Sequence, residues 1–201
     1  MPLPPPRALI FDLGNVLVFH DNGLLFHRLG ARAGLPPQEV VQRLTGAGWT
    51  AANRGQLDAE GIRQDVCGAL GVELPMEEFA PLWSSHFTVH EAVLPLVEAL
   101  EGRVKRVLLS NTNVLHVAYL RPRLPLLQRF DAVLMSCEVG LVKPEPAFFQ
   151  LALERAGCAP HEAAFFDDLP EYVEAANALG IRGHLFTTAP AFAAQLAALG
   201  L

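Results

Sequence analysis

The chain has 201 residues, of which 51% are hydrophobic and 18% are charged, and its formal net charge at pH 7 is −6. This length fits one domain with a modest insertion, and the composition supplies enough apolar side chains for a full core, which excludes extended disorder. The negative charge and the absence of a basic cluster predict no binding to nucleic acid and no attachment to a membrane surface.

The cysteines and the N-terminal segment indicate the compartment. Cys67, Cys137 and Cys158 are odd in number and form no C-x-x-C pair, so they predict neither a disulfide framework nor a thiolate metal site. The N-terminal segment MPLPPPR lacks the apolar stretch of a secretion signal. We expect a soluble protein of the reducing cytoplasm.

The first short apolar run, ALIF at 8–11, predicts a buried strand. About ninety residues separate it from the next such run, instead of the roughly thirty of an ordinary βαβ unit. We interpret most of this stretch as a small helical cap at 18–86, inserted into an α/β core formed by 1–17 and 87–201. Amphipathic patterns predict cap helices at 23–33, 37–45, 58–70 and 76–86, and a core helix at 90–101.

The rest of the core is predicted to alternate between strands and helices. Its apolar runs are continuous rather than alternating, which indicates strands covered on both faces of a parallel sheet. Helices are predicted at 144–157 and 170–180, because each segment has proline near its start and glycine at its end. The pattern predicts an α/β fold with a Rossmann-like doubly wound parallel sheet. The later strands are expected at 104–110, 131–136, 163–167 and 182–187.

Polar side chains follow four of these core segments. Asp12 ends the first strand, Ser110 ends the second, Lys143 follows the third, and Asp167 and Asp168 end the fourth. Ligands of parallel α/β sheets bind beyond the carboxyl ends of the strands. The sequence therefore predicts one site that combines a carboxylate nucleophile, a hydroxyl, a cation and a carboxylate pair.

This set of residues suits phosphoryl transfer. The Asp12 carboxylate can attack phosphorus and form a covalent aspartyl-phosphate, and Asp12 with Asp167 offers the hard oxygen ligands that Mg²⁺ prefers. Lys143 would orient the nucleophile and neutralise phosphate oxygens. Ser110, with the backbone N–H groups around Asn111 and Thr112, would bind phosphate at a helix N-terminus, where Ser110 and Thr112 could also act as N-caps.

In this order the strings FDLGNV, LLSNTN, VKPEP and FFDD resemble motifs I to IV of the haloacid dehalogenase superfamily. Most of its members are Mg²⁺-dependent phosphatases with a Rossmann-like core, and a helical insert between motifs I and II resembles their C1 cap. The strings are most similar to the branch of the α-glucose-1-phosphate phosphatases. The resemblance implies that Asp12 is both nucleophile and metal ligand, and that the Gly14 backbone carbonyl also binds the metal. It further implies that Ser110 binds phosphate, Lys143 orients the nucleophile, Asp167 is the second carboxylate ligand and Asp168 supports the water shell of the metal.

The sequence departs from this family pattern at Gly14. Most phosphatases of the superfamily carry there a second aspartate that serves as general acid and base. Three interpretations remain open: a phosphatase with an easy leaving group, a metal-independent 2-haloacid dehalogenase, or a weakly active regulatory or binding protein. A dehalogenase would need no acid at position 14, because halide departs without a proton. The retained Asp167–Asp168 pair nevertheless favours the phosphatase, because dehalogenation needs no metal. In a phosphatase, His20 and Asp21 are candidates for the missing acid.

A second departure is Tyr172, at a position where related sequences carry Asn or Asp, and Glu171 beside it is a candidate to compensate. In the cap, Trp83 is expected in the core, and the loop around 49–55 is expected to contribute to specificity. We predict hydrolysis of a small phosphate monoester, a sugar phosphate. The sequence predicts neither the individual substrate nor the oligomeric state.

Overall fold

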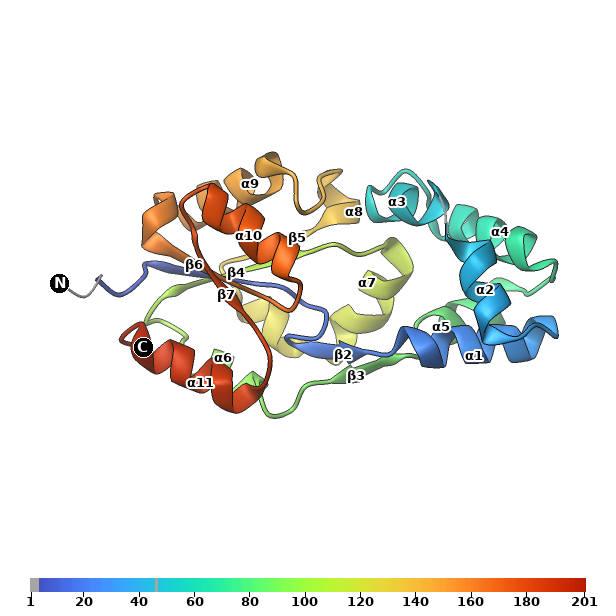
Figure 1. Cartoon of the computed structure of the whole chain (residues 1–201), viewed down its shortest axis with the longest axis horizontal. Helices are drawn as coiled ribbons and strands as arrows, with labels where there is room; N and C mark the ends of the chain where they lie inside the picture. The colour runs from blue at the N-terminus through green and yellow to red at the C-terminus, as the bar shows by residue number, and fades with distance from the viewer. Residues whose placement is uncertain (1–3, 46) are drawn as a thin grey trace.

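The structure, a computed structural model, describes residues 4–45 and 47–201 (Figure 1). A five-stranded sheet in the order β5-β4-β1-β6-β7 forms its centre, and all four strand pairs are parallel. The prediction of a Rossmann-like α/β fold is therefore confirmed. The strands are β1 (Ala8–Phe11), β4 (Lys105–Ser110), β5 (Ala132–Met135), β6 (Ala163–Asp167) and β7 (Arg182–Leu185).

Helices cover both faces of this sheet (Figure 1), which explains why the strand sequences are apolar without alternation. On β1, Leu9 and Phe11 pack into one apolar cluster, whereas Ala8 and Ile10 pack into the other. The first cluster includes Phe192 of α11, and the second is closed by α9 and α10. The core helices are α6 (Leu94–Glu98), α7 (Val114–Leu120), α8 (Ser136–Val139), α9 (Pro146–Ala156), α10 (Pro170–Ala178) and α11 (Ala189–Ala198), with short 3-10 turns at Arg121–Arg123, Pro125–Arg129 and Pro160–Glu162.

The helix predicted at 90–101 is shorter than expected. Only Leu94–Glu98 is α-helical, because turns occupy the residues on either side. Gly102 has a φ of 72°, a left-handed conformation that favours glycine and ends the turn before β4. Helix α11, which no predicted element covered, packs its Phe192 against Phe11 and Phe166 of the sheet.

The described residues of the cap form five helices, whose hydrophobic cluster includes the fully buried Phe79 and Trp83 and extends to Leu115 of α7. Asp58 accepts a hydrogen bond from the Gly61 N–H and caps its helix as predicted, and Gly71 ends that helix in a left-handed conformation. The segment predicted at 76–86 ends earlier, at Trp83. The cap helices are α1 (Asn22–Ala33), α2 (Pro37–Leu44), α3 (Ala47–Asn53), α4 (Ala59–Leu70) and α5 (Met76–Trp83).

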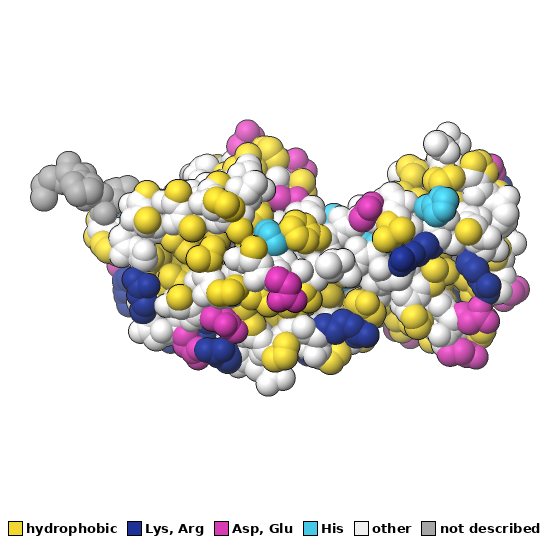
Figure 2. All heavy atoms as spheres, turned by 90° about the horizontal axis from the view of Figure 1, so that it is seen from below, with side chains coloured by type: hydrophobic (Ala, Val, Ile, Leu, Met, Phe, Trp, Pro, Cys, Tyr) yellow, Lys and Arg dark blue, Asp and Glu magenta, His cyan; other side chains and the backbone are white. Residues whose placement is uncertain are grey.

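A two-stranded antiparallel ribbon connects the cap to the core. It pairs β2 (Val18–His20) with β3 (Phe87–Val89), so that His20 lies opposite Phe87. Figure 2 shows a hollow in the surface between the larger core and the smaller cap. The ribbon lies near the borders predicted at 18 and 86, and those borders stay a prediction. Among the described residues, no helix is long and apolar enough to span a bilayer.

Candidate active site

A pocket of about 590 Å³ lies at the carboxyl ends of the strands, where core and cap meet. Asp12 and Ser110 line it from the ends of β1 and β4, and Lys143 lines it from the loop before α9. Trp49 and Asn53 of α3 line it from the cap. The loop expected to contribute to specificity is thus largely a helix, and that helix faces the strand ends.

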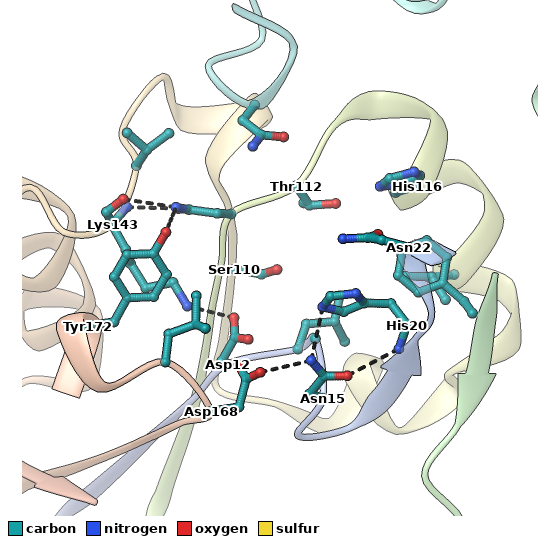
Figure 3. Close-up of a pocket in the computed structure, with 18 of the residues that line it drawn as sticks. Asp12, Asn15, His20, Asn22, Ser110, Thr112, His116, Lys143, Asp168 and Tyr172 are labelled. Carbon is teal, nitrogen blue, oxygen red and sulfur yellow. Dashed lines mark hydrogen bonds and ion pairs between the residues drawn. The ribbon is translucent and has the colours of Figure 1, made fainter. Parts of the chain in front are cut away.

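Lys143 connects the two buried carboxylates of the site. Its Nζ lies 2.6 Å from Asp12 Oδ1 and 2.6 Å from Asp167 Oδ2 (Figure 3). The Lys143 side chain is 1% exposed, so this ammonium has exchanged its water for the two carboxylates. The ion pair between Lys143 and Asp12 joins residues more than one hundred positions apart in the sequence. The ion pair between Lys143 and Asp167 joins residues twenty-four positions apart.

Burial and the two ion pairs have opposite effects on the pKa values of Asp12, Asp167 and Lys143. Burial raises the pKa of Asp12, and it raises the pKa of Asp167 to about 7, although the Lys143 ammonium acts against both shifts. Burial alone would lower the pKa of Lys143, but the two facing carboxylates outweigh it and that pKa is raised. A single cation therefore serves two desolvated carboxylates, and an additional cation would stabilise the ionised site.

Asp168 completes an acidic cluster suited to a metal ion. Asp12, Asp167 and Asp168 each offer a carboxylate oxygen, and these three oxygens lie within 4.8 Å of one another. Asp168 accepts a hydrogen bond of 2.8 Å from Asn15 Nδ2, which fixes one of its oxygens. Hard oxygen donors at this spacing fit Mg²⁺, so the residues present are compatible with the predicted metal.

The predicted phosphate cradle differs from the structure in detail. The hydroxyls of Ser110 and Thr112 lie at the pocket (Figure 3). The Thr112 backbone N–H, however, donates to Ser136 Oγ at 2.8 Å, so it is not directed at a ligand. Asn113 rather than Ser110 or Thr112 caps α7, because its side chain accepts from the His116 N–H.

Asn111 positions the loop that carries Lys143. Its Nδ2 donates to the Lys143 carbonyl at 2.9 Å and to the Tyr172 hydroxyl at 3.2 Å, and its Oδ1 accepts from the Lys143 N–H at 2.8 Å. The amide side chain of Asn111 is thereby occupied by the protein. Its place at the pocket supports Lys143, and the direct contact with phosphate predicted for it stays a prediction.

Comparisons with known proteins agree with this architecture. Residues 6–180 match the family model described as haloacid dehalogenase-like hydrolase. The chain belongs to that family. It is 33% identical over 189 residues to phosphatase MT3486 of Mycobacterium tuberculosis, covering 89% of this chain and 86% of that protein. It is 28% identical over 184 residues to the D-ribitol-5-phosphate phosphatase of Bacteroides thetaiotaomicron, covering 87% and 88%.

Some relatives of this haloacid dehalogenase-like hydrolase are much longer proteins. It is 30% identical over 189 residues to mouse acyl-CoA dehydrogenase family member 10, covering 87% of this chain and spanning 17% of that protein. Among solved structures, a haloacid dehalogenase family enzyme of Bacteroides thetaiotaomicron, in complex with magnesium and inorganic phosphate, has a TM-score of 0.83 at 23% identity, covering 90% of this chain and 94% of that one. The L-2-haloacid dehalogenase of Xanthobacter autotrophicus has a TM-score of 0.62 at 22% identity, covering 88% and 75%. These structures show the fold, and the resemblance to the α-glucose-1-phosphate phosphatase branch stays a prediction.

Tyr172, the second departure from the family pattern, lies beside Lys143. Its hydroxyl accepts from Asn111, and its ring centroid lies 4.8 Å from Lys143 Nζ. Tyr172 therefore contacts the cation of the site. Glu171 is exposed and is not among the residues that line the pocket, so the structure gives no support to the compensating role considered for it.

Three histidines line the pocket, and only one of them, His20, was predicted from the sequence as a candidate acid. His86 and His116 were missed. His20, His86 and His116 line the pocket, and they come from β2, the segment before β3 and α7. Any two of them are at least 30 residues apart in the sequence, so no spacing signal could have grouped them. Asn15 was also missed; its left-handed backbone, with a φ of 53°, becomes visible only in the fold.

The buried His116 makes stability depend on pH. Burial, with a smaller contribution from nearby His86, lowers the pKa of His116 from its ordinary value of 6.5 to about 3. The unfolded chain takes up this proton below pH 6.5 and the folded chain does not, so stability is lost as the pH falls from 6.5 toward 3. Between pH 6.5 and pH 5 we expect about 2 kcal/mol of loss from this residue.

Urea unfolding of the wild type and of His116→Phe at pH 7 and pH 5 checks this expectation. The phenyl ring preserves the packing against Trp83, whose ring centroid lies 5.7 Å away, and removes the titrating group. The variant should lose about 2 kcal/mol less than the wild type on acidification. Equal losses in the two proteins would contradict the account of His116.

Proposed function

We propose that this protein is an Mg²⁺-dependent phosphatase that hydrolyses a small phosphate monoester, a sugar phosphate, through a covalent aspartyl-phosphate on Asp12. One observation carries the proposal: the Asp12 carboxylate lies at the pocket, held by Lys143, within the acidic cluster with Asp167 and Asp168. The phosphatase names of two relatives, and a similar structure in complex with magnesium and inorganic phosphate, support it.

Asp12, Asp167 and Asp168 would hold the magnesium ion, together with the Gly14 backbone carbonyl that the family resemblance implies. When bound, the ion supplies positive charge that neutralises phosphate oxygens beside an anionic nucleophile. The raised pKa values of Asp12 and Asp167 are consistent with a site that lacks part of its balancing positive charge.

The protein's own residues divide the chemistry among them. Asp12 attacks phosphorus through the carboxylate oxygen that Lys143 leaves free. Lys143 fixes the orientation of that carboxylate and contributes a buried positive charge. The hydroxyls of Ser110 and Thr112 donate hydrogen bonds to phosphate oxygens. The cap side of the pocket encloses the leaving group and limits the access of bulk water.

The lining of the leaving-group side favours an uncharged, hydroxylated group. Among the described residues that line the pocket, Lys143 is the only lysine or arginine, and two carboxylates already occupy it. Arg54, which follows the pocket-lining Asn53 in the sequence, forms an ion pair with Glu145. A second anion on the substrate would thus lack a cation to bind it, whereas Asn22, Thr50 and Asn53 offer hydrogen bonds to hydroxyl groups.

A substrate panel tests the proposed function. Inorganic phosphate release should be measured from sugar and polyol phosphates, phosphoglycolate, phosphoserine and nucleotides, each with Mg²⁺ and with EDTA. We expect release only with Mg²⁺, and kcat/KM for the best sugar or polyol phosphate at least about tenfold above that for phosphoglycolate, because the carboxylate of phosphoglycolate has no cationic partner. Absence of phosphate release from every ester would contradict the proposal.

The same panel includes 2-haloacids, because Gly14 left a dehalogenase open and the dehalogenase fold is similar. Halide release that survives EDTA would establish that alternative. The acidic cluster favours the phosphatase, since dehalogenation requires no metal and would gain nothing from three carboxylates within 4.8 Å.

A further inference from the structure

The side-chain amide of Asn111 determines how the hydroxyl of Tyr172 is used. Asn111 Oδ1 accepts from the Lys143 backbone N–H at 2.8 Å, and this contact identifies which end of the amide is the oxygen. Its Nδ2 then donates to the Lys143 carbonyl at 2.9 Å and to the Tyr172 hydroxyl at 3.2 Å. Because an amide nitrogen can only donate, the Tyr172 oxygen accepts in this contact and its own proton is left for another partner.

The proton of the Tyr172 hydroxyl has no acceptor among the described residues. Its oxygen forms one hydrogen bond there, the one that it accepts from Asn111. The buried carboxylates of Asp12 and Asp167 accept from Lys143 instead. Burial raises the pKa of the Tyr172 hydroxyl above its ordinary value of 10, although Lys143 acts against the shift, so the proton is retained at neutral pH. Tyr172 lines the pocket, and the hydroxyl is therefore available to donate to a molecule bound there.

The side chain of Tyr172 is held at both ends. It belongs to the first turn of α10, and its ring packs against the apolar cluster that α9 and α10 close. The ring centroid lies 4.8 Å from Lys143 Nζ (Figure 3). Asn111 holds the oxygen at the other end of the ring. A donor that is positioned in this way before a ligand arrives loses little conformational freedom on binding.

The partners of Tyr172 belong to the core and lie around the nucleophile. Lys143 Nζ is 2.6 Å from Asp12 Oδ1, and Asn111 directly follows Ser110 at the end of β4. The lining residues of α3, by contrast, come from the cap. The hydroxyl therefore lies with the groups that would hold the phosphoryl group of a substrate, and not with those that would enclose its leaving group. Anionic phosphate oxygens are also the strongest acceptors that such a substrate offers.

We propose that Tyr172 is a substrate-binding residue whose hydroxyl donates a hydrogen bond to a phosphoryl oxygen, and that Asn111 is the positioning residue that orients it. The inference rests on the proposed phosphatase function. The hydrogen bond that Tyr172 accepts from Asn111 polarises its O–H group and makes it a stronger donor. Tyr172 thereby adds a neutral donor beside Lys143, the one lysine or arginine among the described residues that line the pocket.

The binding of inorganic phosphate tests this contact separately from turnover. Wild type and Tyr172→Phe are titrated with phosphate in the presence of Mg²⁺ by isothermal titration calorimetry. The phenylalanine ring preserves the packing beside Lys143 and removes the hydroxyl alone. The Kd of the variant for phosphate should be higher by about tenfold or more, as expected when a hydrogen bond to a charged group is lost. An unchanged Kd would overturn the role of Tyr172.

The second tyrosine of the chain provides the matched control. Tyr119 also has a cation over its ring, since the Arg123 guanidinium carbon lies 3.8 Å from the ring centroid, but Tyr119 does not line the pocket. Tyr119→Phe should keep the wild-type Kd for phosphate. Equal losses of affinity in the two variants would contradict a specific contact at Tyr172. Thermal unfolding of each variant verifies that the fold persists.

A double-variant cycle separates a direct contact with phosphate from an effect through Asn111, because Tyr172→Phe also removes an acceptor from that amide. In an Asn111→Ala background, Tyr172→Phe should still raise the Kd for phosphate by at least about threefold. No further rise in that background would mean that the hydroxyl acts only through Asn111, and the inference would be wrong. Failure of the proposed function would look different: the wild type would release no phosphate from any ester, or Asp12→Asn would stay active.

Discussion

Replacing Asp12 by asparagine should reduce the turnover of 4-nitrophenyl phosphate with Mg²⁺ by about 10⁴-fold or more, because the neutral amide cannot form the covalent intermediate. Asparagine has nearly the same shape, and its carbonyl oxygen can still accept from Lys143. The buried Asp12 carboxylate has a raised pKa, so folding works against its charge at neutral pH. In EDTA the variant should therefore be as stable as the wild type or more stable.

Steady-state kinetics and urea unfolding of the same preparation check both halves of this prediction. A matched control is Asp131→Asn, since Asp131 also pairs with a lysine, Lys105, at 2.7 Å but lies on the surface. The control should keep its activity. An Asp12→Asn variant that turns over at the wild-type rate would exclude Asp12 as the nucleophile, whereas an inactive and unfolded variant would show that Asp12 supports the fold.

Replacing Lys143 by methionine should cost both activity and stability. We expect turnover to fall by about 10³-fold, because the nucleophile loses its orienting cation. The buried carboxylates of Asp12 and Asp167 lose their shared partner, and breaking a buried ion pair in this way typically costs about 3–5 kcal/mol at neutral pH. The deficit should shrink as the pH falls to about 5, since burial raises the pKa of Asp167 to about 7 even beside Lys143, and without that cation the carboxyl takes up a proton more readily still.

Lys105 provides the control for this substitution. The chain has two lysines, and each places Nζ within 2.7 Å of an aspartate oxygen. The Lys105 side chain is 58% exposed, so Lys105→Met should change the free energy of unfolding by less than about 1 kcal/mol. Equal and pH-independent effects of the two substitutions would contradict the coupling of Lys143 to the buried carboxylates.

The core of this site could be predicted because it depends on short-range patterns. Each buried strand is a continuous apolar run, and the residue after it lies at the carboxyl edge of the sheet whatever its distance along the chain. Asp12, Ser110 and Asp167 follow such runs directly. Asp12 and Ser110 line the pocket, and Asp167 meets Asp12 at the Lys143 ammonium. Their convergence therefore required only the sheet topology, and the parallel order β5-β4-β1-β6-β7 supplies it.

The cap side of the site could not be predicted in the same way. The ribbon pairs three residues near position 19 with three near position 88, and neither segment has a strand pattern that is readable alone. Helix α3 has a weakly amphipathic sequence, AGWTAAN, and its position depends on packing against α4 and α8 rather than on local signals. The His20 ring approaches Gly14 closely, with 3.0 Å between its Cδ2 and the position of a Cβ on residue 14. This approach arises from the turn in which the Val18 N–H donates to the Leu13 carbonyl, a contact visible only in the fold.

Trapping of the phosphoenzyme tests the central claim most directly. The protein is mixed with Mg²⁺ and 4-nitrophenyl phosphate, quenched in acid during turnover, digested and analysed by mass spectrometry. The account predicts one phosphoryl group on the peptide that contains Asp12, and no such group in EDTA or in Asp12→Asn. Rapid phosphate release with an unmodified Asp12 peptide, or a phosphoryl group on a different residue, would contradict it.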